Sequence, residues 1–168
     1  IRDLEIFKKY KNNVEIIFTI TMLEENFRKI FEPFASSIKS RLDAAKNLIE
    51  NSISVSSFFG PILPYISDLD LENYFKTMKE IGIKKVFIDK LRLKPGIWER
   101  LEKGLKNYPE ILEKWKKIFF EKSDYYFKLK REIKEIGKKF GIELIFCYWT
   151  FIIFPSISNI FPKNFSIV

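Results

Sequence analysis

The sequence contains no histidine and only one cysteine among its 168 residues. Without histidine the chain lacks the usual general base near neutral pH and the commonest metal ligand, so a Ser-His-Asp hydrolase and a histidine-ligated zinc site are excluded. Cys147 alone cannot form an internal disulfide framework, nor a cysteine-built zinc or iron–sulfur site within this chain. This sparing use of cysteine favours the reducing cytoplasm as the compartment.

The abundant residues indicate one folded, basic domain. Apolar residues make up 46% of the chain and aromatic residues 17%, which is far more than a disordered chain carries. The length is that of a single ordinary domain. With 30 Lys and Arg against 22 Asp and Glu, the net charge is +8, so polyanions are better partners than cationic molecules.

The first part of the chain alternates between strand and helix patterns. Stretches rich in β-branched and aromatic residues at 14–21, 54–59 and 85–91 predict strands, and apolar residues at helical spacing predict helices at 36–49 and 67–81. Connections of this length cannot be hairpins between neighbouring strands. The pattern therefore predicts an α/β fold with a parallel sheet covered by helices.

Capping residues mark where these helices begin and end. Ser36 or Ser37 is expected to cap the first helix, and Ser67 or Asp68 the second, because their side-chain oxygens can accept from free N–H groups in the first turn. Gly82 is expected to end the second helix. After the second strand, Pro61 and its neighbours are expected to stop the pairing.

From Pro95 onward the pattern becomes mainly helical. Helices are expected at 97–105, 108–120 and 123–140, and a short final strand at 143–148. An apolar tail follows, which prolines interrupt, so we do not expect it to span a membrane. We divide the chain into an α/β region at 1–94, a helical extension with a final strand at 95–148 and the apolar tail at 149–168.

Two threonines lie at the carboxyl end of the first predicted strand. Alternation places Thr19 and Thr21 on the same face as Glu15 and Ile17, opposite an apolar set. Parallel α/β sheets bind ligands at the carboxyl ends of their strands. Threonine is also simply a good strand former, and the spacing alone favours that simpler interpretation.

Short motifs in a fixed order across residues 2–148 add a family resemblance. Together they resemble the spore photoproduct lyase-like branch of the radical S-adenosylmethionine (SAM) enzymes, a branch that includes DNA-repair lyases. The matching segments are Arg2-Asp3-Leu4, Thr19-Ile20-Thr21, Glu32-Pro33, Arg41-Leu42, Pro61-Ile62-Leu63-Pro64, Asp89 to Gly96, Ser123-Asp124-Tyr125-Tyr126 and Phe146-Cys147-Tyr148.

The resemblance implies a partial (β/α) barrel. In the family, the amino-terminal half carries a C-x-x-x-C-x-x-C loop that holds a [4Fe-4S] cluster, and SAM bound to the cluster is cleaved to a 5′-deoxyadenosyl radical. By alignment Ile1 falls just after the third strand of the barrel, so we expect a truncated, carboxyl-terminal fragment that lacks the cluster motif. Such a fragment would be inactive alone and would depend on the missing half, in the same chain or a separate one.

The resemblance also assigns residues to the cofactor. Thr19 and Thr21 match positions near the SAM ribose or carboxylate, and Pro61 matches the turn beside the adenine. Tyr65 stands where glycine is more usual in that turn, and Met22 replaces a second threonine. No catalytic residue and no metal ligand is assigned within this chain.

Charged residues of the motifs suggest two further roles. Lys90, Arg92 and Lys94 follow the third strand, where they could meet an anionic substrate or a phosphate backbone, or could simply be solvated. Glu32 and Arg41 are interpreted as a structural pair that anchors a loop.

Two alternatives to the radical SAM interpretation remain. Residues 103–139 hold 12 Lys and Arg against 6 acidic residues, which is typical of a basic nucleic-acid-binding module without catalysis but also of a solvated helix face. A decayed, truncated reading frame is the other alternative.

Overall fold

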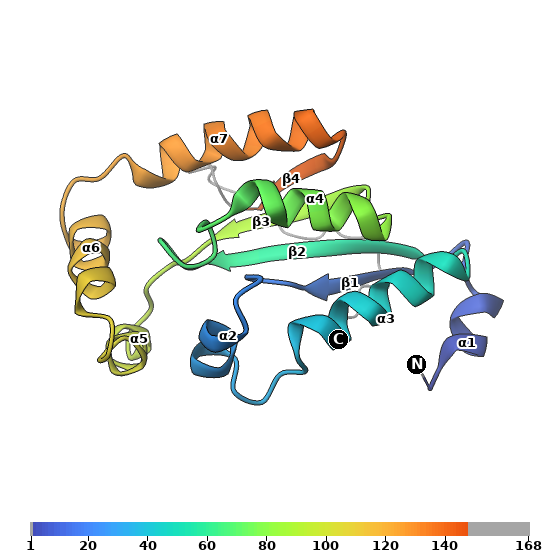
Figure 1. Cartoon of the computed structure of the whole chain (residues 1–168), viewed down its shortest axis with the longest axis horizontal. Helices are drawn as coiled ribbons and strands as arrows, with labels where there is room; N and C mark the ends of the chain where they lie inside the picture. The colour runs from blue at the N-terminus through green and yellow to red at the C-terminus, as the bar shows by residue number, and fades with distance from the viewer. Residues whose placement is uncertain (1, 148–168) are drawn as a thin grey trace.

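The computed structural model describes residues 2–147, which form seven helices and four strands (Figure 1). The elements are α1 (Leu4–Lys9), β1 (Glu15–Thr19), α2 (Glu25–Phe31), α3 (Ile38–Glu50), β2 (Ser54–Ile62), α4 (Leu71–Ile81), β3 (Lys85–Lys90), α5 (Ile97–Gly104), α6 (Pro109–Phe120), α7 (Tyr125–Phe140) and β4 (Glu143–Cys147). The predicted tail at 149–168 lies outside the described residues.

The strands form one parallel sheet in the order β1-β2-β3-β4, which confirms the predicted α/β class. The final strand joins the same sheet, because Lys85 pairs with Glu143 and Asp89 with Cys147. The order of strands along the sheet is the order along the chain, without a reversal. A right-handed crossover between each pair of neighbours then places one helix from each connection on the same face.

The main core confirms that arrangement, because α3, α4 and α7 pack on one face of the sheet and follow its strands in order (Figure 1). Its fully buried side chains include Leu48 from α3, Phe75 from α4 and Ile133 from α7. Val86 and Ile88 contribute from β3. Burial of large apolar side chains in this layer is the main source of stability that the structure shows.

A second core ties α2, α5 and α6 to the loop that follows β2. Its largest member, Trp115, is fully buried, and its indole Nε1 donates a hydrogen bond to the Pro64 carbonyl oxygen at 2.6 Å. A buried indole N–H needs such a partner. The helical region after β3 is thus divided between the two cores. Helices α5 and α6 pack in the second core, beside the loop that follows β2, whereas α7 and β4 pack in the main core.

The face of the sheet opposite α3, α4 and α7, here called the second face, carries an apolar row. Register aligns Thr19 with Phe58, Phe58 with Phe87, and Phe87 with Ile145. None of the three apolar members belongs to either core that the described residues form. Ile17 lies on the same face of β1 and also belongs to neither core.

Helix caps agree with the sequence at one helix and differ at another. The Ser37 hydroxyl accepts from the Ser40 N–H at 3.1 Å, as predicted for α3. For α4 the prediction of Ser67 or Asp68 is wrong, because the cap is Asp70, which accepts from the Asn73 N–H at 3.0 Å. The Ser67 hydroxyl is engaged elsewhere, since it accepts from the Leu63 N–H at 2.9 Å in the preceding loop.

The end of β2 also differs from the prediction, since the strand runs through Pro61 to Ile62 instead of stopping before Gly60. Pairing resumes at Ile62 with Lys90 after a shift of register beyond Phe59. Proline cannot donate to a ladder and is tolerated where a strand is irregular. The irregularity therefore lets Pro61 remain in the strand.

Gly137→Ala should lower the free energy of unfolding by about 1 kcal/mol or more, although alanine favours a helix by about 1 kcal/mol. A Cβ at residue 137 would lie 2.5 Å from Leu144 Cδ1, so α7 and β4 would have to separate or Leu144 to move. Urea denaturation measures the change. Glu132→Ala, at an exposed position of α7, is the control and should stay within about 0.5 kcal/mol. An equally small loss for Gly137→Ala would contradict the close approach.

Candidate functional site at the carboxyl edge of the sheet

The carboxyl ends of the four strands bring a small polar group together. The buried Thr21 hydroxyl donates to the Gly60 carbonyl oxygen at 3.4 Å. Gly60 in turn lies against Asp89, because a Cβ built on Gly60 would be 3.1 Å from both Asp89 Cβ and the Asp89 carbonyl oxygen. Asp89 is aligned with Cys147 on β4. A glycine is therefore needed where β2 and β3 approach at this edge.

An arginine from α3 fixes the end of β1. Arg41 Nη1 donates to the Thr19 carbonyl oxygen at 2.8 Å and lies 2.8 Å from Glu32 Oε2. The two side chains are only 12% and 21% exposed, so solvent screens the pair weakly. The predicted Glu32–Arg41 pair is thus confirmed, and it holds the backbone beside Thr19.

Arg28, which the sequence analysis did not single out, braces the loop that contains Glu32. Its side chain is 9% exposed, and its Nη1 donates to the carbonyl oxygens of Glu32 and Ala35, each at 2.9 Å. Its Nε donates to Glu25 Oε1 at 2.7 Å. The hydrogen bond from the Ile38 N–H, and then Arg28, hold the pKa of Glu25 below its ordinary value against partial desolvation. Glu25 and Arg28 are three residues apart in the sequence, and this spacing could have predicted their ion pair on one face of a helix.

Asp89 is the titratable group at the centre of this edge. Burial raises its pKa above the ordinary value, although Arg92 at 3.4 Å and the Lys90 N–H at 3.0 Å favour the charged form. Burial, followed by the charge of Asp89, raises the pKa of the Cys147 thiol. A carboxyl with a raised pKa at the ligand-binding edge of a parallel sheet is a candidate functional group.

The structure separates the three predicted basic residues. The Arg92 guanidinium turns back to Asp89, whereas the Lys90 ammonium lies 6.0 Å from the ring centroid of Tyr126, on the helix-covered side. Lys94 is exposed in the loop before α5. Thr19, Thr21 and Pro61 do come together at the ends of β1 and β2, although Thr21 is buried and Pro61 is exposed.

A half-buried pair of Tyr125 and Asp68, which the sequence patterns did not predict, joins α7 to the loop after β2. The Tyr125 hydroxyl donates to Asp68 Oδ2, and desolvation by burial raises the pKa of both groups. Next to it, the Tyr126 hydroxyl donates to the Ile62 carbonyl oxygen at 3.1 Å. Both contacts hold the carboxyl end of β2, so α7 supports the same edge.

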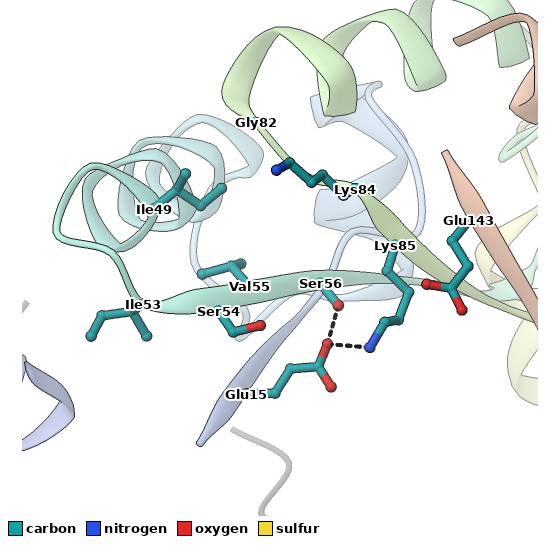
Figure 2. A pocket seen from close by; sticks show the side chains of 10 residues that line it. All are labelled: Glu15, Ile49, Ile53, Ser54, Val55, Ser56, Gly82, Lys84, Lys85 and Glu143. Atoms are coloured by element: carbon teal, nitrogen blue, oxygen red, sulfur yellow. Dashed lines mark hydrogen bonds and ion pairs between the residues drawn. The ribbon is translucent and has the colours of Figure 1, made fainter. Parts of the chain in front are cut away.

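A pocket of about 270 Å³ lies at the opposite, amino edge of the sheet (Figure 2). In it Glu15 accepts hydrogen bonds from Ser56 and from Lys85, the latter at 2.8 Å. Burial raises the pKa of Glu15, but these two hydrogen bonds outweigh it, and the pKa lies below the ordinary value. Because parallel sheets bind ligands at the other edge, we assign this cluster a stabilising role.

Fold and site together define an α/β protein whose parallel sheet has a polar carboxyl edge. Two uncharacterized proteins are similar to it. MJ0683 of Methanocaldococcus jannaschii is 40% identical over 70 residues, which cover 42% of this chain and 27% of that protein. ORF301 of Acidianus two-tailed virus is 30% identical over 145 residues, which cover 83% of this chain and 42% of that protein.

The chain spans less than half the length of either relative. No protein-family model matches the chain, and no solved structure matches it. Within residues 2–147, no helix is long and apolar enough to cross a membrane.

Arg41→Gln should lower the free energy of unfolding by about 2 kcal/mol, because it leaves the Glu32 carboxylate and the Thr19 carbonyl without their cation. Chemical denaturation measures the loss. Lys39→Gln is the matched control on the same helix, since its ion pair with Asp43 is 84% and 62% exposed and should contribute less than about 0.5 kcal/mol. Equal effects of the two substitutions would contradict the anchoring role of Arg41.

Asp89→Asn should raise the free energy of unfolding at neutral pH. A carboxyl with a raised folded-state pKa contributes stability that is complete below its ordinary pKa of 3.8 and is lost as the pH rises through the raised value. Because solvent reaches part of this carboxyl, the gain on removing its charge should be about 0.5 kcal/mol. Denaturation at several pH values should show the gain disappearing in acid, and a gain that persists below that pKa would contradict this cause. Asp43→Asn, at an exposed position of α3, is the control.

Proposed function

We propose that this chain is the carboxyl-terminal part of a radical SAM protein related to spore photoproduct lyase and the DNA-repair lyases. The observation that supports the proposal best is the unreversed parallel sheet with α3, α4 and α7 on a single face. Doubly wound sheets reverse their order and carry helices on both faces, whereas barrels keep their helices outside. This topology supports a partial (β/α) barrel, in which the second face would turn toward the barrel interior.

The carboxyl edge has groups suited to a nucleoside sulfonium such as SAM. The Thr19 hydroxyl lies on the second face and can both donate and accept. The Thr21 hydroxyl already donates a hydrogen bond to the Gly60 carbonyl oxygen, so we assign it a positioning role. It would hold the turn that brings Pro61 against the adenine. When bound to a reduced cluster, SAM supplies a 5′-deoxyadenosyl radical.

The residues of this chain do not suffice for the cluster itself. A [4Fe-4S] cluster that binds SAM needs three thiolates, and Cys147 is the only cysteine in the sequence. The thiol of Cys147 is also half-buried, and its pKa is raised by burial, which disfavours the thiolate. We therefore assign the cluster to an amino-terminal half, which this chain would complete.

The ion pairs in the helical region give less support to a nucleic-acid-binding module. Lys116 lies 2.7 Å from Glu113, and Lys128 lies 2.8 Å from Asp124. Lys139 is paired with Glu72 of α4 at 2.5 Å. The pairs with Glu113 and Asp124 are already counted in the net excess of residues 103–139, so only the pair with Glu72 lowers that excess. The nucleic-acid-binding module therefore remains the second candidate, after the carboxyl edge.

Reconstitution with a cluster-bearing half tests the proposal. The chain would be co-expressed with the polypeptide encoded immediately upstream of Ile1, and the mixture loaded anaerobically with iron and sulfide. We expect formation of 5′-deoxyadenosine from SAM only when both polypeptides are present. Thr19→Val should raise the KM for SAM about fivefold through the loss of one hydrogen bond.

Thr77→Val on α4, away from the carboxyl edge, is the matched control and should leave that KM unchanged. Mass spectrometry of the nucleoside products measures both variants. An upstream polypeptide without three cysteines, or a loaded assembly that forms no 5′-deoxyadenosine, would refute the radical SAM assignment.

A further inference from the structure

Strand β1 lies at one end of the sheet, and its outer edge, here called the open edge, has no neighbouring strand among residues 2–147. The strand pairs with β2 at five consecutive residues, Glu15–Thr19, without a shift of register. Proteins usually protect such an edge with proline, a bulge or a charged side chain. β1 contains no proline and no bulge, and its one charged residue, Glu15, is bonded to Ser56 and Lys85. The open edge is therefore suited to accept a further strand.

The hydrogen bonds at the end of β1 show which main-chain groups face the open edge. The Ile20 N–H donates to the Phe58 carbonyl oxygen of β2 at 3.0 Å. In a parallel strand only every second residue bonds to the same neighbour, so Ile17 and Thr19 direct their main-chain groups to the open edge. The Thr19 carbonyl oxygen agrees, because it accepts from Arg41 Nη1 at 2.8 Å instead of from a strand. The Ile17 N–H, the Ile17 carbonyl oxygen and the Thr19 N–H therefore have no partner in the part of the chain that the structure describes.

Helix α1 indicates the direction and the chain position of the strand that the open edge would take. Its Leu4 and Phe7 pack against the main core, where α3, α4 and α7 also pack. Each of those three helices leads into the strand that follows it in the order along the sheet, in a right-handed crossover. α1 leads into β1 in the same way. It therefore has the position of a crossover helix whose first strand would lie at the open edge, parallel to β1.

We propose that the open edge binds one parallel strand of the amino-terminal half, which in the complete barrel would precede α1. The inference rests on the proposed function, because that half supplies the strand. The added strand would accept from the N–H groups of Ile17 and Thr19 and donate to the Ile17 carbonyl oxygen. Since Arg41 already bonds to the Thr19 carbonyl oxygen, the added ladder would end at that point, and Arg41 sets where the two halves stop pairing.

Amide hydrogen exchange in the full 168-residue chain, followed by NMR, tests this register. In the chain alone, the amides of Ile17 and Thr19 should exchange faster than those of Ile16 and Phe18, which face β2. Addition of the polypeptide encoded immediately upstream of Ile1 should slow exchange at Ile17 and Thr19 about tenfold or more and leave the other two nearly unchanged. Unchanged rates at Ile17 and Thr19 would overturn the proposal. So would slowing that depends only on the concentration of this chain, because a second copy would then occupy the open edge.

A proline substitution gives an independent measurement. Ile17→Pro removes an N–H that faces the open edge and none that faces β2, so it should weaken association with the upstream polypeptide about tenfold in isothermal titration calorimetry. Ile17→Val is the matched control, because it shortens the same side chain but keeps the N–H, and it should bind within about twofold. Circular dichroism checks that both variants fold, and equal affinities of the two folded variants would contradict the proposed ladder. Hydrogen exchange in the unaltered chain decides the question for a proline variant that does not fold.

Formation of 5′-deoxyadenosine reports separately on the proposed function. Protection of Ile17 and Thr19 without this product would support the strand addition and refute the radical SAM assignment. Product without protection would support that assignment and overturn the strand addition.

Discussion

The handedness of the β-α-β crossovers is the constraint on which the rest of the molecule depends. Each connection returns the chain to the next position of a parallel sheet, and because the order never reverses, α3, α4 and α7 are kept on one side. This one-sided placement of the helices produces the main core on one face of the sheet and leaves the second face outside that core. The carboxyl ends of all four strands then meet at one edge, where parallel sheets hold their ligands.

The support of that edge comes from outside the sheet. Arg41 reaches from α3 to the end of β1, and Trp115 reaches from α6 to the loop that follows β2. Each donates to a main-chain carbonyl at or beyond the end of a strand, so side chains help to hold the edge where the ladder hydrogen bonds end. The helical region after β3 therefore supports the candidate site as well as extending the fold.

Strand composition and capping let the sequence predict the parallel sheet and the Ser37 cap, because these are properties of neighbouring residues. The Glu32–Arg41 pair was predicted from the charged residues of the family motifs. The sequence did not reveal that β4 would join the sheet, because the strand pairing is with a segment about 58 residues earlier in the chain, Lys85 to Glu143. Nor did it single out Asp89, whose raised pKa arises from burial at the edge. Such properties depend on tertiary contacts that spacing does not encode.

The two cores are not fully independent, since Leu23 and Leu42 pack against both. Leu23 lies in the segment between β1 and α2, and Leu42 lies in the covering helix α3. A fluctuation that loosens α5 and α6 would therefore be transmitted to the start of the main core without unfolding the sheet. Because Arg41, the residue before Leu42, donates to the Thr19 carbonyl oxygen, a loosened second core would also weaken the hold on the end of β1.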